Sequence, residues 1–164
     1  RADIFVTTKI WVEDFAAGDL QRAAAASVER LGLTPDLLLL HWPKPTPDFV
    51  ETLGALNDAK TRGLTRSIGL SNFPSAQFRE AQSVSDAWLV TNQVEYHPYL
   101  AQRTLQATAN DLGSSLTAWS PLAQGKVAPG RHQTRPRTAK AASRWARSTR
   151  FPDLIRPMPP SGRD

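Results

Sequence analysis

Short strand-like segments and helical patterns alternate along most of this sequence, and this alternation constrains the possible folds more than any other feature. The strand-like segments are residues 3–8, 37–40, 66–70, 88–94 and 115–119. Chains with this alternation form a parallel sheet whose strands are joined by right-handed helical crossovers. The sequence therefore predicts an α/β fold, and its 164 residues, 40% of them hydrophobic, are enough for one domain with a core.

The second segment is a run of four leucines that leads into His41, Trp42 and Pro43. The run lacks the alternation of a half-buried strand and is too short for a helix, so it indicates a strand covered on both faces. Pro43 cannot donate a ladder hydrogen bond, so it ends the strand. His41 then lies at the carboxyl end, which carries the catalytic groups in barrels of alternating strands and helices. A histidine of the core is the alternative for this residue alone.

Residues typical of helix ends separate the strands. The predicted helix starts are Asp19, Asp48 and Pro74, and the predicted ends are Gly32, Gly63, Val84 and Gly113. The first helix is expected to bury one face that contains Leu20, Ala24 and Leu31.

The net charge of +5 is unevenly distributed. Residues 1–127 hold 11 Lys and Arg against 13 Asp and Glu, whereas residues 128–164 hold 9 against 2 and six of the 13 prolines. We therefore predict a domain over residues 1–127 and a disordered, Pro- and Arg-rich tail over residues 128–164. A basic arm that binds nucleic acid or anionic lipid, and a frame change or artificial join, are alternatives for the tail.

The body of the chain has the charge balance of an ordinary enzyme or binding domain, without a basic face carrying interleaved aromatic residues. No apolar run approaches the ~20 residues of a membrane span. The absence of cysteine excludes a disulfide framework and a thiolate zinc site, and it fits an intracellular protein. We expect a cytoplasmic protein that binds no nucleic acid, no membrane and no metal.

A polar or aromatic residue lies at or near the carboxyl end of each predicted strand. These residues are Lys9, His41, Asn72, Gln93 and Trp119, at intervals of 32, 31, 21 and 26 residues. Because parallel strands end at the same edge of a sheet, we expect the five side chains to converge on one site. Each of them alone is also compatible with a turn, strand-end or core residue.

Several other chemistries lack their motifs. Residues 69–73 resemble a nucleophile elbow, but no glycine stands two positions after Ser71. The three histidines are too dispersed for a zinc-binding helix. Neither G-x-G-x-x-G nor a P-loop occurs, so a bound nucleotide would be held at the ends of the strands rather than by a Rossmann turn.

Five motifs together resemble the aldo-keto reductase family over residues 3–127. They are FVTTKIW at 5–11, LLHWP at 39–43, SIGLSNF at 67–73, NQVEYHP at 92–98 and AWSPL at 118–122. Residues 9–14 and 63–66 are most similar to the bacterial 2,5-diketo-D-gluconate reductases. The resemblance implies part of a (β/α)8 TIM barrel, about strands 3 to 7 with their helices.

The resemblance also implies transfer of hydride from NADPH to an aldehyde or ketone, with methylglyoxal and 2,5-diketo-D-gluconate as possible substrates. The family uses an Asp, Tyr, Lys and His tetrad, in which Lys9 and His41 match the lysine and the histidine. The developing oxyanion needs a proton donor and hydrogen-bond donors. His41 can donate an N–H to it, and the Lys9 ammonium would lower the pKa of the tyrosine acid.

Further site residues follow from the same resemblance. Those that match cofactor contacts are Ser71, Asn72, Gln93, Trp119, Ser120, Leu122 and Gln124. Of these, Ser71, Asn72 and Gln93 match the groups that hydrogen-bond the nicotinamide carboxamide, and Trp119 matches the ring that stacks on the nicotinamide. Ser120, Leu122 and Gln124 match the loop at the pyrophosphate. Trp11 and Trp42 would form walls of the substrate pocket.

The sequence departs from the family pattern at both ends. The tetrad Asp and Tyr precede the lysine in the family, and neither Tyr96 nor Tyr99 matches the motif of the acid. We therefore expect a fragment that is inactive alone and whose full-length relative is monomeric. The alternative function is a non-catalytic nucleotide-binding or scaffold protein derived from the same barrel.

Overall fold

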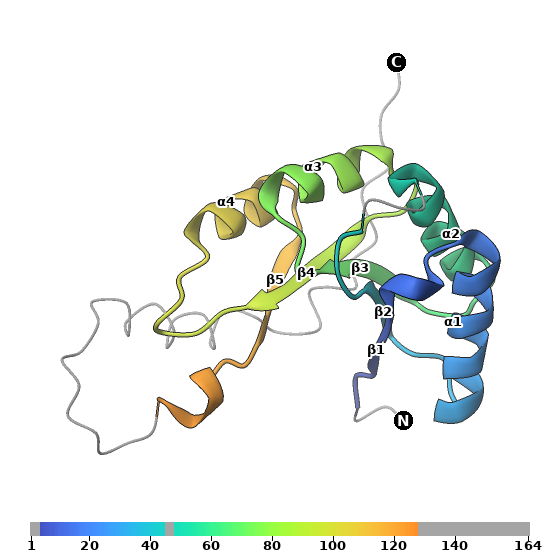
Figure 1. The fold of residues 1–164 in the computed structure, drawn as a ribbon, viewed down its shortest axis with the longest axis horizontal. Coiled ribbons are helices and arrows are strands. Elements are labelled where there is room, and N and C mark those ends of the chain that lie inside the picture. Colours follow the sequence, from blue (N-terminus) through green and yellow to red (C-terminus); the bar gives the residue numbers. More distant parts are fainter. Residues whose placement is uncertain (1–3, 45–47, 128–164) are drawn as a thin grey trace.

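The computed structural model describes residues 4–44 and 48–127 and contains one five-stranded parallel sheet (Figure 1). The strands are β1 (Thr7–Ile10), β2 (Leu37–Leu40), β3 (Ser67–Ser71), β4 (Leu89–Glu95) and β5 (Ser115–Trp119). The helices are α1 (Ala17–Leu31), α2 (Phe49–Thr61), α3 (Ser75–Val84) and α4 (Arg103–Asp111), and the 3-10 turns are η1 (Val12–Asp14) and η2 (Ala123–Gly125).

The spatial order of the strands is their order in the sequence, and every neighbouring pair is parallel. Lys9 pairs with Leu39, and Leu39 pairs with Gly69 in β3. The four helices lie in an arc along one side of the sheet (Figure 1). The predicted α/β fold with strands and helices of a partial TIM barrel is confirmed.

The leucine run forms the strand expected from the sequence, and all four side chains are buried. Leu38 and Leu40 belong to the core between the sheet and the helices. Leu37 and Leu39 point to the other face, where they line a hollow of about 190 Å³ together with residues of β1, β3, β4 and β5. In a closed barrel this second face is the interior.

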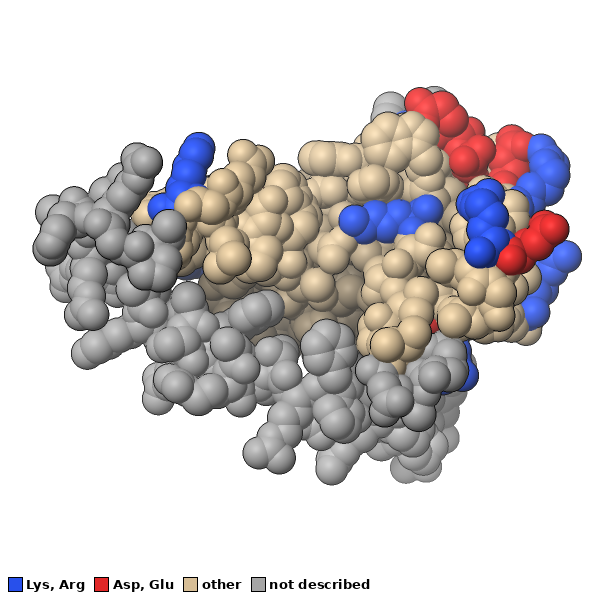
Figure 2. All heavy atoms as spheres, turned by 90° about the horizontal axis from the view of Figure 1, so that it is seen from below, with Lys and Arg blue, Asp and Glu red and all other residues tan. Residues whose placement is uncertain are grey.

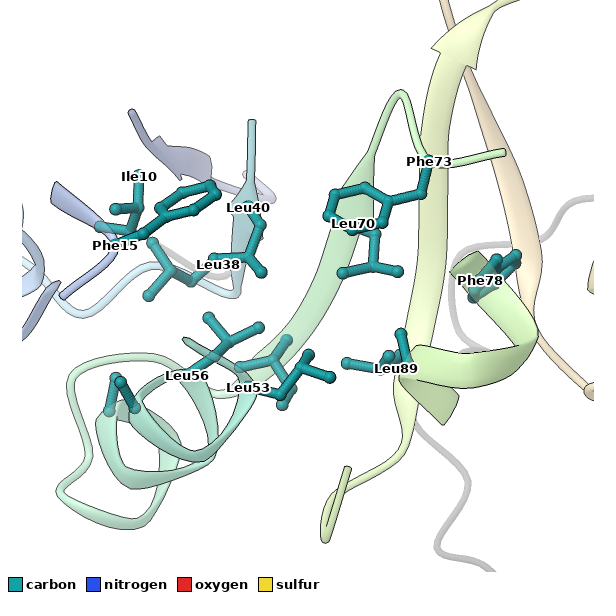
Figure 3. Packing of buried hydrophobic residues seen from close by; sticks show 14 of the residues in the cluster. Ile10, Phe15, Leu38, Leu40, Leu53, Leu56, Leu70, Phe73, Phe78 and Leu89 are labelled. Atoms are coloured by element: carbon teal, nitrogen blue, oxygen red, sulfur yellow. The ribbon is translucent and has the colours of Figure 1, made fainter. Parts of the chain in front are cut away.

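The core fills the space between the sheet and the helices. Figure 3 shows Leu38, Leu40 and Leu70 of the strands opposite Leu53 and Leu56 of α2. Phe15, Phe73, Phe78 and Leu89 extend the same cluster along the sheet. Burying a side chain of this size contributes roughly 1.5–3 kcal/mol, so this layer holds the helices against the sheet.

Asp48 caps α2 as predicted, because its carboxylate accepts a hydrogen bond from the backbone N–H of Val50. The prediction for Asp19 is wrong. Helix α1 begins at Ala17, and Asp19 lies in its first turn, where its carboxylate bonds the side chain of Arg22. An acidic residue in the first turn is stabilised by the helix dipole, so it need not occupy the cap.

The glycines predicted to end α1, α2 and α4 follow these helices, and α3 ends at Val84 as predicted. Gly32, Gly63 and Gly113 follow their helices with φ values between 65° and 75°, the conformation that favours glycine. Pro74 lies one residue before α3. Leu31 is exposed, because the buried stripe of α1 ends at Ser27.

The first strand begins later than predicted. The backbone N–H of Val6 donates to the Asp36 carboxylate, and the Val6 carbonyl accepts from the N–H groups of Asp36 and Leu37. The regular ladder starts at Thr7, so residues 4–6 are not part of it.

Charged side chains of both signs gather at the end of the molecule that α1 and α2 form (Figure 2). Two of the ion pairs there join Arg22 to Asp19 and Arg62 to Asp58.

Across the described part of the chain, none of the helices is long and apolar enough to cross a bilayer. The predicted disordered tail, residues 128–164, lies outside the described residues.

Candidate active site

The predicted site residues lie at or just beyond the carboxyl ends of the five strands. Lys9 is in the last half of β1, His41 follows β2, Asn72 follows β3, Gln93 is in β4 and Trp119 ends β5. The parallel ladder brings these ends to one edge of the sheet. The structure thus joins residues that are up to 110 positions apart in the sequence.

Asn72 lies at the centre of this group. Its Nδ2 donates to the His41 carbonyl at 2.9 Å and to the Ser71 Oγ at 3.1 Å, and its Oδ1 accepts from the Trp119 Nε1 at 2.9 Å. One side chain therefore connects the ends of β2, β3 and β5. Asn72 has a φ of 65°, a conformation that asparagine tolerates better than most residues.

Gln93 is connected to the same group through its backbone. Its carbonyl accepts from the Ser71 Oγ and from the Asn72 backbone N–H, each at 2.9 Å. Its side-chain Oε1 is buried, and within residues 4–44 and 48–127 it has no hydrogen-bond partner. A buried amide oxygen without a partner costs stability, which is expected where a ligand supplies the missing donor.

The positive charge of Lys9 acts on His41. Burial lowers the pKa of Lys9. The pKa of His41 is lowered first by burial and second by the positive charge of Lys9. Both effects favour a neutral imidazole at pH 7, so one ring nitrogen carries a hydrogen and can donate it to a carbonyl oxygen.

The Trp11 ring packs against His41, and Trp42 follows His41 in the sequence, whereas their predicted role as walls of a substrate pocket stays a prediction. The Trp11 ring lies edge-on to the imidazole, with 4.9 Å between the ring centroids and 81° between the planes. Trp11 and Trp42 are 49% and 44% exposed, so both rings are partly accessible from solvent. The Lys44 Nζ donates to the Val12 carbonyl at 3.1 Å and thereby joins the two segments that carry these rings.

The segment after β5 has an unusual backbone. Four residues other than glycine have positive φ in the described ranges, and they are Asn72, Ser120, Ala123 and Gln124. All four lie at the carboxyl side of the sheet. Because such conformations are costly for residues with a Cβ, their concentration there indicates a functional site.

The side chains predicted to meet the pyrophosphate point to solvent to different degrees. Leu122 and Gln124 are exposed, and Ser120 is partly buried.

The sequence analysis missed two residues of this region, Ala123, which is buried in η2, and Lys44. Lys44 has no local signal, because its bond to the Val12 carbonyl joins segments 32 residues apart. In the described part of the chain, no three His, Cys, Asp or Glu side chains are grouped closely enough to hold a metal ion.

The fold and this site together define a class of protein: an α/β protein whose candidate site lies at the carboxyl ends of parallel strands. The sequence profile of the Aldo/keto reductase family matches residues 1–152, and the chain belongs to this family. The match extends past Val127, and the domain boundary predicted there stays a prediction.

Curated relatives agree with the profile. An aldo-keto reductase of Mycolicibacterium smegmatis is 40% identical over 129 residues, which cover 77% of this chain and 47% of the relative. Methylglyoxal reductase DkgB of Escherichia coli O157:H7 is 38% identical over 131 residues, which cover 77% and 49%. The chain spans about half the length of the curated relatives it matches.

Solved structures are similar over the same extent. A crystal structure of a candidate 2,5-diketo-D-gluconic acid reductase B superimposes with a TM-score of 0.76 and 45% identity, covering 80% of this chain and 47% of that one. The Bombyx mori aldo-keto reductase AKR2E4 in complex with NADP gives a TM-score of 0.72 and 34% identity, covering 90% and 52%.

Proposed function

We propose that this chain is the central part of an NADPH-dependent carbonyl reductase. The observation that carries this proposal is the hydrogen-bonded group that joins His41, Ser71, Asn72, Gln93 and Trp119 at the ends of four neighbouring strands. Family membership supports an oxidoreductase, and a relative that binds NADP supports the choice of cofactor. The cofactor would supply a hydride to the carbonyl carbon of the substrate.

The unpartnered Oε1 of Gln93 fits an amide donor such as the nicotinamide carboxamide. Ser71 and Asn72 fix the backbone of Gln93, and Trp119 is oriented by its bond to Asn72. A ring held in this way can present a flat face for stacking at little entropic cost. These residues would therefore orient the cofactor, whereas Ser120, Leu122 and Gln124 would meet its pyrophosphate.

His41 would bind the oxygen of the substrate carbonyl. Its neutral imidazole donates one N–H to that oxygen and stabilises the negative charge that develops there. Lys9 supplies positive potential at His41. Both residues are needed for carbonyl reduction but not for nucleotide binding alone, which favours a reductase over a non-catalytic nucleotide-binding or scaffold protein.

Small aldehydes and ketones are the proposed substrates. Relatives named methylglyoxal reductase and glyoxal reductase, and a similar structure named for 2,5-diketo-D-gluconic acid, support this class. The exposed rings of Trp11 and Trp42 would form the walls of a pocket for such molecules. We further propose a cytoplasmic location, a monomeric full-length protein and no partner other than the small-molecule substrate.

Calorimetric titration of the full 164-residue chain with NADPH tests the cofactor assignment. We expect binding by the wild type and a loss of about tenfold in affinity for Gln93→Met, because the buried acceptor is removed. Gln21→Met is the matched control, since Gln21 in α1 also has a buried, unpartnered Oε1 among the described residues. Equal affinities of the two variants would contradict the assignment.

Residues 1–164 alone are proposed to lack turnover, because no tyrosine in them matches the family acid. The test is the consumption of NADPH with methylglyoxal, with an aldo-keto reductase of full length as the positive control. Turnover by the 164-residue chain that is lost in His41→Ala would show that the acid is supplied by another group.

A further inference from the structure

The loop that follows β4 and the segment that follows β5 enclose a hollow of about 440 Å³. It is lined by Glu95, His97, Tyr99, Ala123, Gln124 and Lys126. In Figure 1 the turn η2, drawn in orange, lies below the loop between β4 and α4. Two segments that are about 25 residues apart in the sequence therefore meet beside the candidate active site.

His97 is fixed in one orientation by bonds from both of its ring nitrogens. The Tyr99 backbone N–H donates to the His97 Nδ1 at 3.3 Å, so Nδ1 is the acceptor. The hydrogen of the neutral ring is then on Nε2, which lies 3.2 Å from the Glu95 Oε1 and donates to it. The backbone carbonyl of Glu95 accepts a hydrogen bond from the Gln102 side chain at 2.9 Å, which holds Glu95 in place.

The Tyr99 side chain contacts the segment that follows β5. Its hydroxyl donates to the Lys126 carbonyl at 3.2 Å, although the side chain is 46% exposed. The Tyr99 ring also lies beside the His97 ring, with 6.2 Å between centroids. Glu95, His97, Tyr99 and Lys126 thus form a continuous link from β4 to the residue after η2.

The segment at the end of this link carries three of the left-handed residues, Ser120, Ala123 and Gln124. Backbone bonds such as Ala123 N–H to Ser120 carbonyl and Gly125 N–H to Leu122 carbonyl are local to the segment. Local bonds of this kind shape a turn but do not fix its position relative to the sheet. A contact from a different element is needed for that, and Tyr99 provides one.

We propose that His97 and Tyr99 are positioning residues that hold residues 120–127 against the loop after β4, and that this contact sets the affinity of the segment for the pyrophosphate of a dinucleotide. The link to the dinucleotide rests on the proposed function, whereas the holding of the segment does not. His97 acts through Tyr99, whose backbone N–H donates to its Nδ1.

The first test measures amide hydrogen exchange in the free chain. Tyr99→Phe removes the bond to Lys126 and keeps the ring, so exchange at Gly125, Lys126 and Val127 should become about fivefold faster. His97→Ala should have the same effect, whereas His97→Asn should restore slow exchange because its carboxamide can still accept from the Tyr99 N–H. Exchange in β3 and β4 should not change in any variant.

Tyr96→Phe is the matched control, because it deletes a hydroxyl from the same loop and leaves the Tyr99 bond to Lys126 in place. Unchanged exchange at residues 125–127 in both Tyr99→Phe and His97→Ala would overturn the positioning role. Equal acceleration in Tyr96→Phe and Tyr99→Phe would overturn it too, because a general loosening of the loop would explain both.

The second test is the dissociation constant of NADPH for the same variants. We expect an increase of about fivefold for Tyr99→Phe and His97→Ala, and none for His97→Asn or Tyr96→Phe. Faster exchange with an unchanged dissociation constant would overturn the link to the dinucleotide. If the wild type fails to bind NADPH, the proposed function is wrong, and the exchange data still decide whether the two residues hold the segment.

Discussion

Asn72 shows how much a single side chain contributes to this site. Its carboxamide is the donor to the His41 carbonyl and the acceptor for the Trp119 indole, and its backbone adopts the left-handed conformation. From the sequence, Asn72 is equally compatible with an ordinary turn. Only the partners, 31 and 47 residues away, distinguish the two roles.

The charge state of His41 is a second property at the residue scale. Its pKa is lowered by burial and by Lys9, so the unfolded chain binds a proton more readily than the folded chain. This group therefore makes stability fall as the pH drops below about 6.5, the ordinary value, until the lowered pKa of the folded state is passed.

Replacing Lys9 by Met should raise the pKa of His41, because the neighbouring charge is removed and only the effect of burial remains. The measurement is an NMR titration of the histidine ring protons in both proteins. Lys60→Met is the control, since Lys60 lies in the last turn of α2 and is not among the causes of the lowered pKa of His41. A His41 titration that is the same in all three proteins would exclude electrostatic contact with Lys9.

At the scale of elements, the contrast between Asp48 and Asp19 shows what a capping signal can specify. Both precede a helical pattern, but only Asp48 lies at the N-cap, where its carboxylate accepts from the N–H of Val50. In α1 the chain leaves η1 and enters the helix at Ala17, before Asp19 is reached. The position of η1, which precedes the helix, thus sets the first residue of α1.

Asp48→Ala should reduce the free energy of unfolding by about 1 kcal/mol, because the N–H of Val50 loses its acceptor. Asp48→Asn should retain most of the stability, since asparagine caps helices nearly as well as aspartate. Urea unfolding of the three proteins measures the difference. An asparagine variant as unstable as the alanine variant would indicate that the charge, rather than the cap, matters at this position.

At the scale of the whole molecule, the second face of the sheet depends on close approach between strands at Gly69. A Cβ there would lie 2.6 Å from the Thr91 carbonyl oxygen and 2.9 Å from a Leu39 methyl carbon. The first of these atoms is backbone and cannot move without shifting β4. Three of the five strands therefore share one small space, and only glycine fits it.

Gly69→Ala should lower the free energy of unfolding by roughly 1–3 kcal/mol or more, as overpacking does in a dense interior. Gly54→Ala is the matched control, because a Cβ at Gly54, an exposed position in α2, meets nothing within 4 Å. That control should gain roughly 0.5–1 kcal/mol from helix propensity. A loss of similar size in both variants, measured by urea unfolding, would count against close packing at Gly69.

The sequence alone determined the features that depend on neighbours along the chain. The strand and helix order, the parallel sheet, the buried leucine strand and the cap at Asp48 all follow from local patterns. So does the placement of Lys9, His41, Asn72, Gln93 and Trp119 at the strand ends, because strand boundaries are read from short runs of residues. Their roles in binding and chemistry stay predictions.

Tertiary structure alone decided the features that depend on residues distant in sequence. These include the bonds that centre on Asn72, the unpartnered oxygen of Gln93 and the link from His97 through Tyr99 to Lys126. A local pattern cannot specify such features, because their energies arise only when separate segments have packed together.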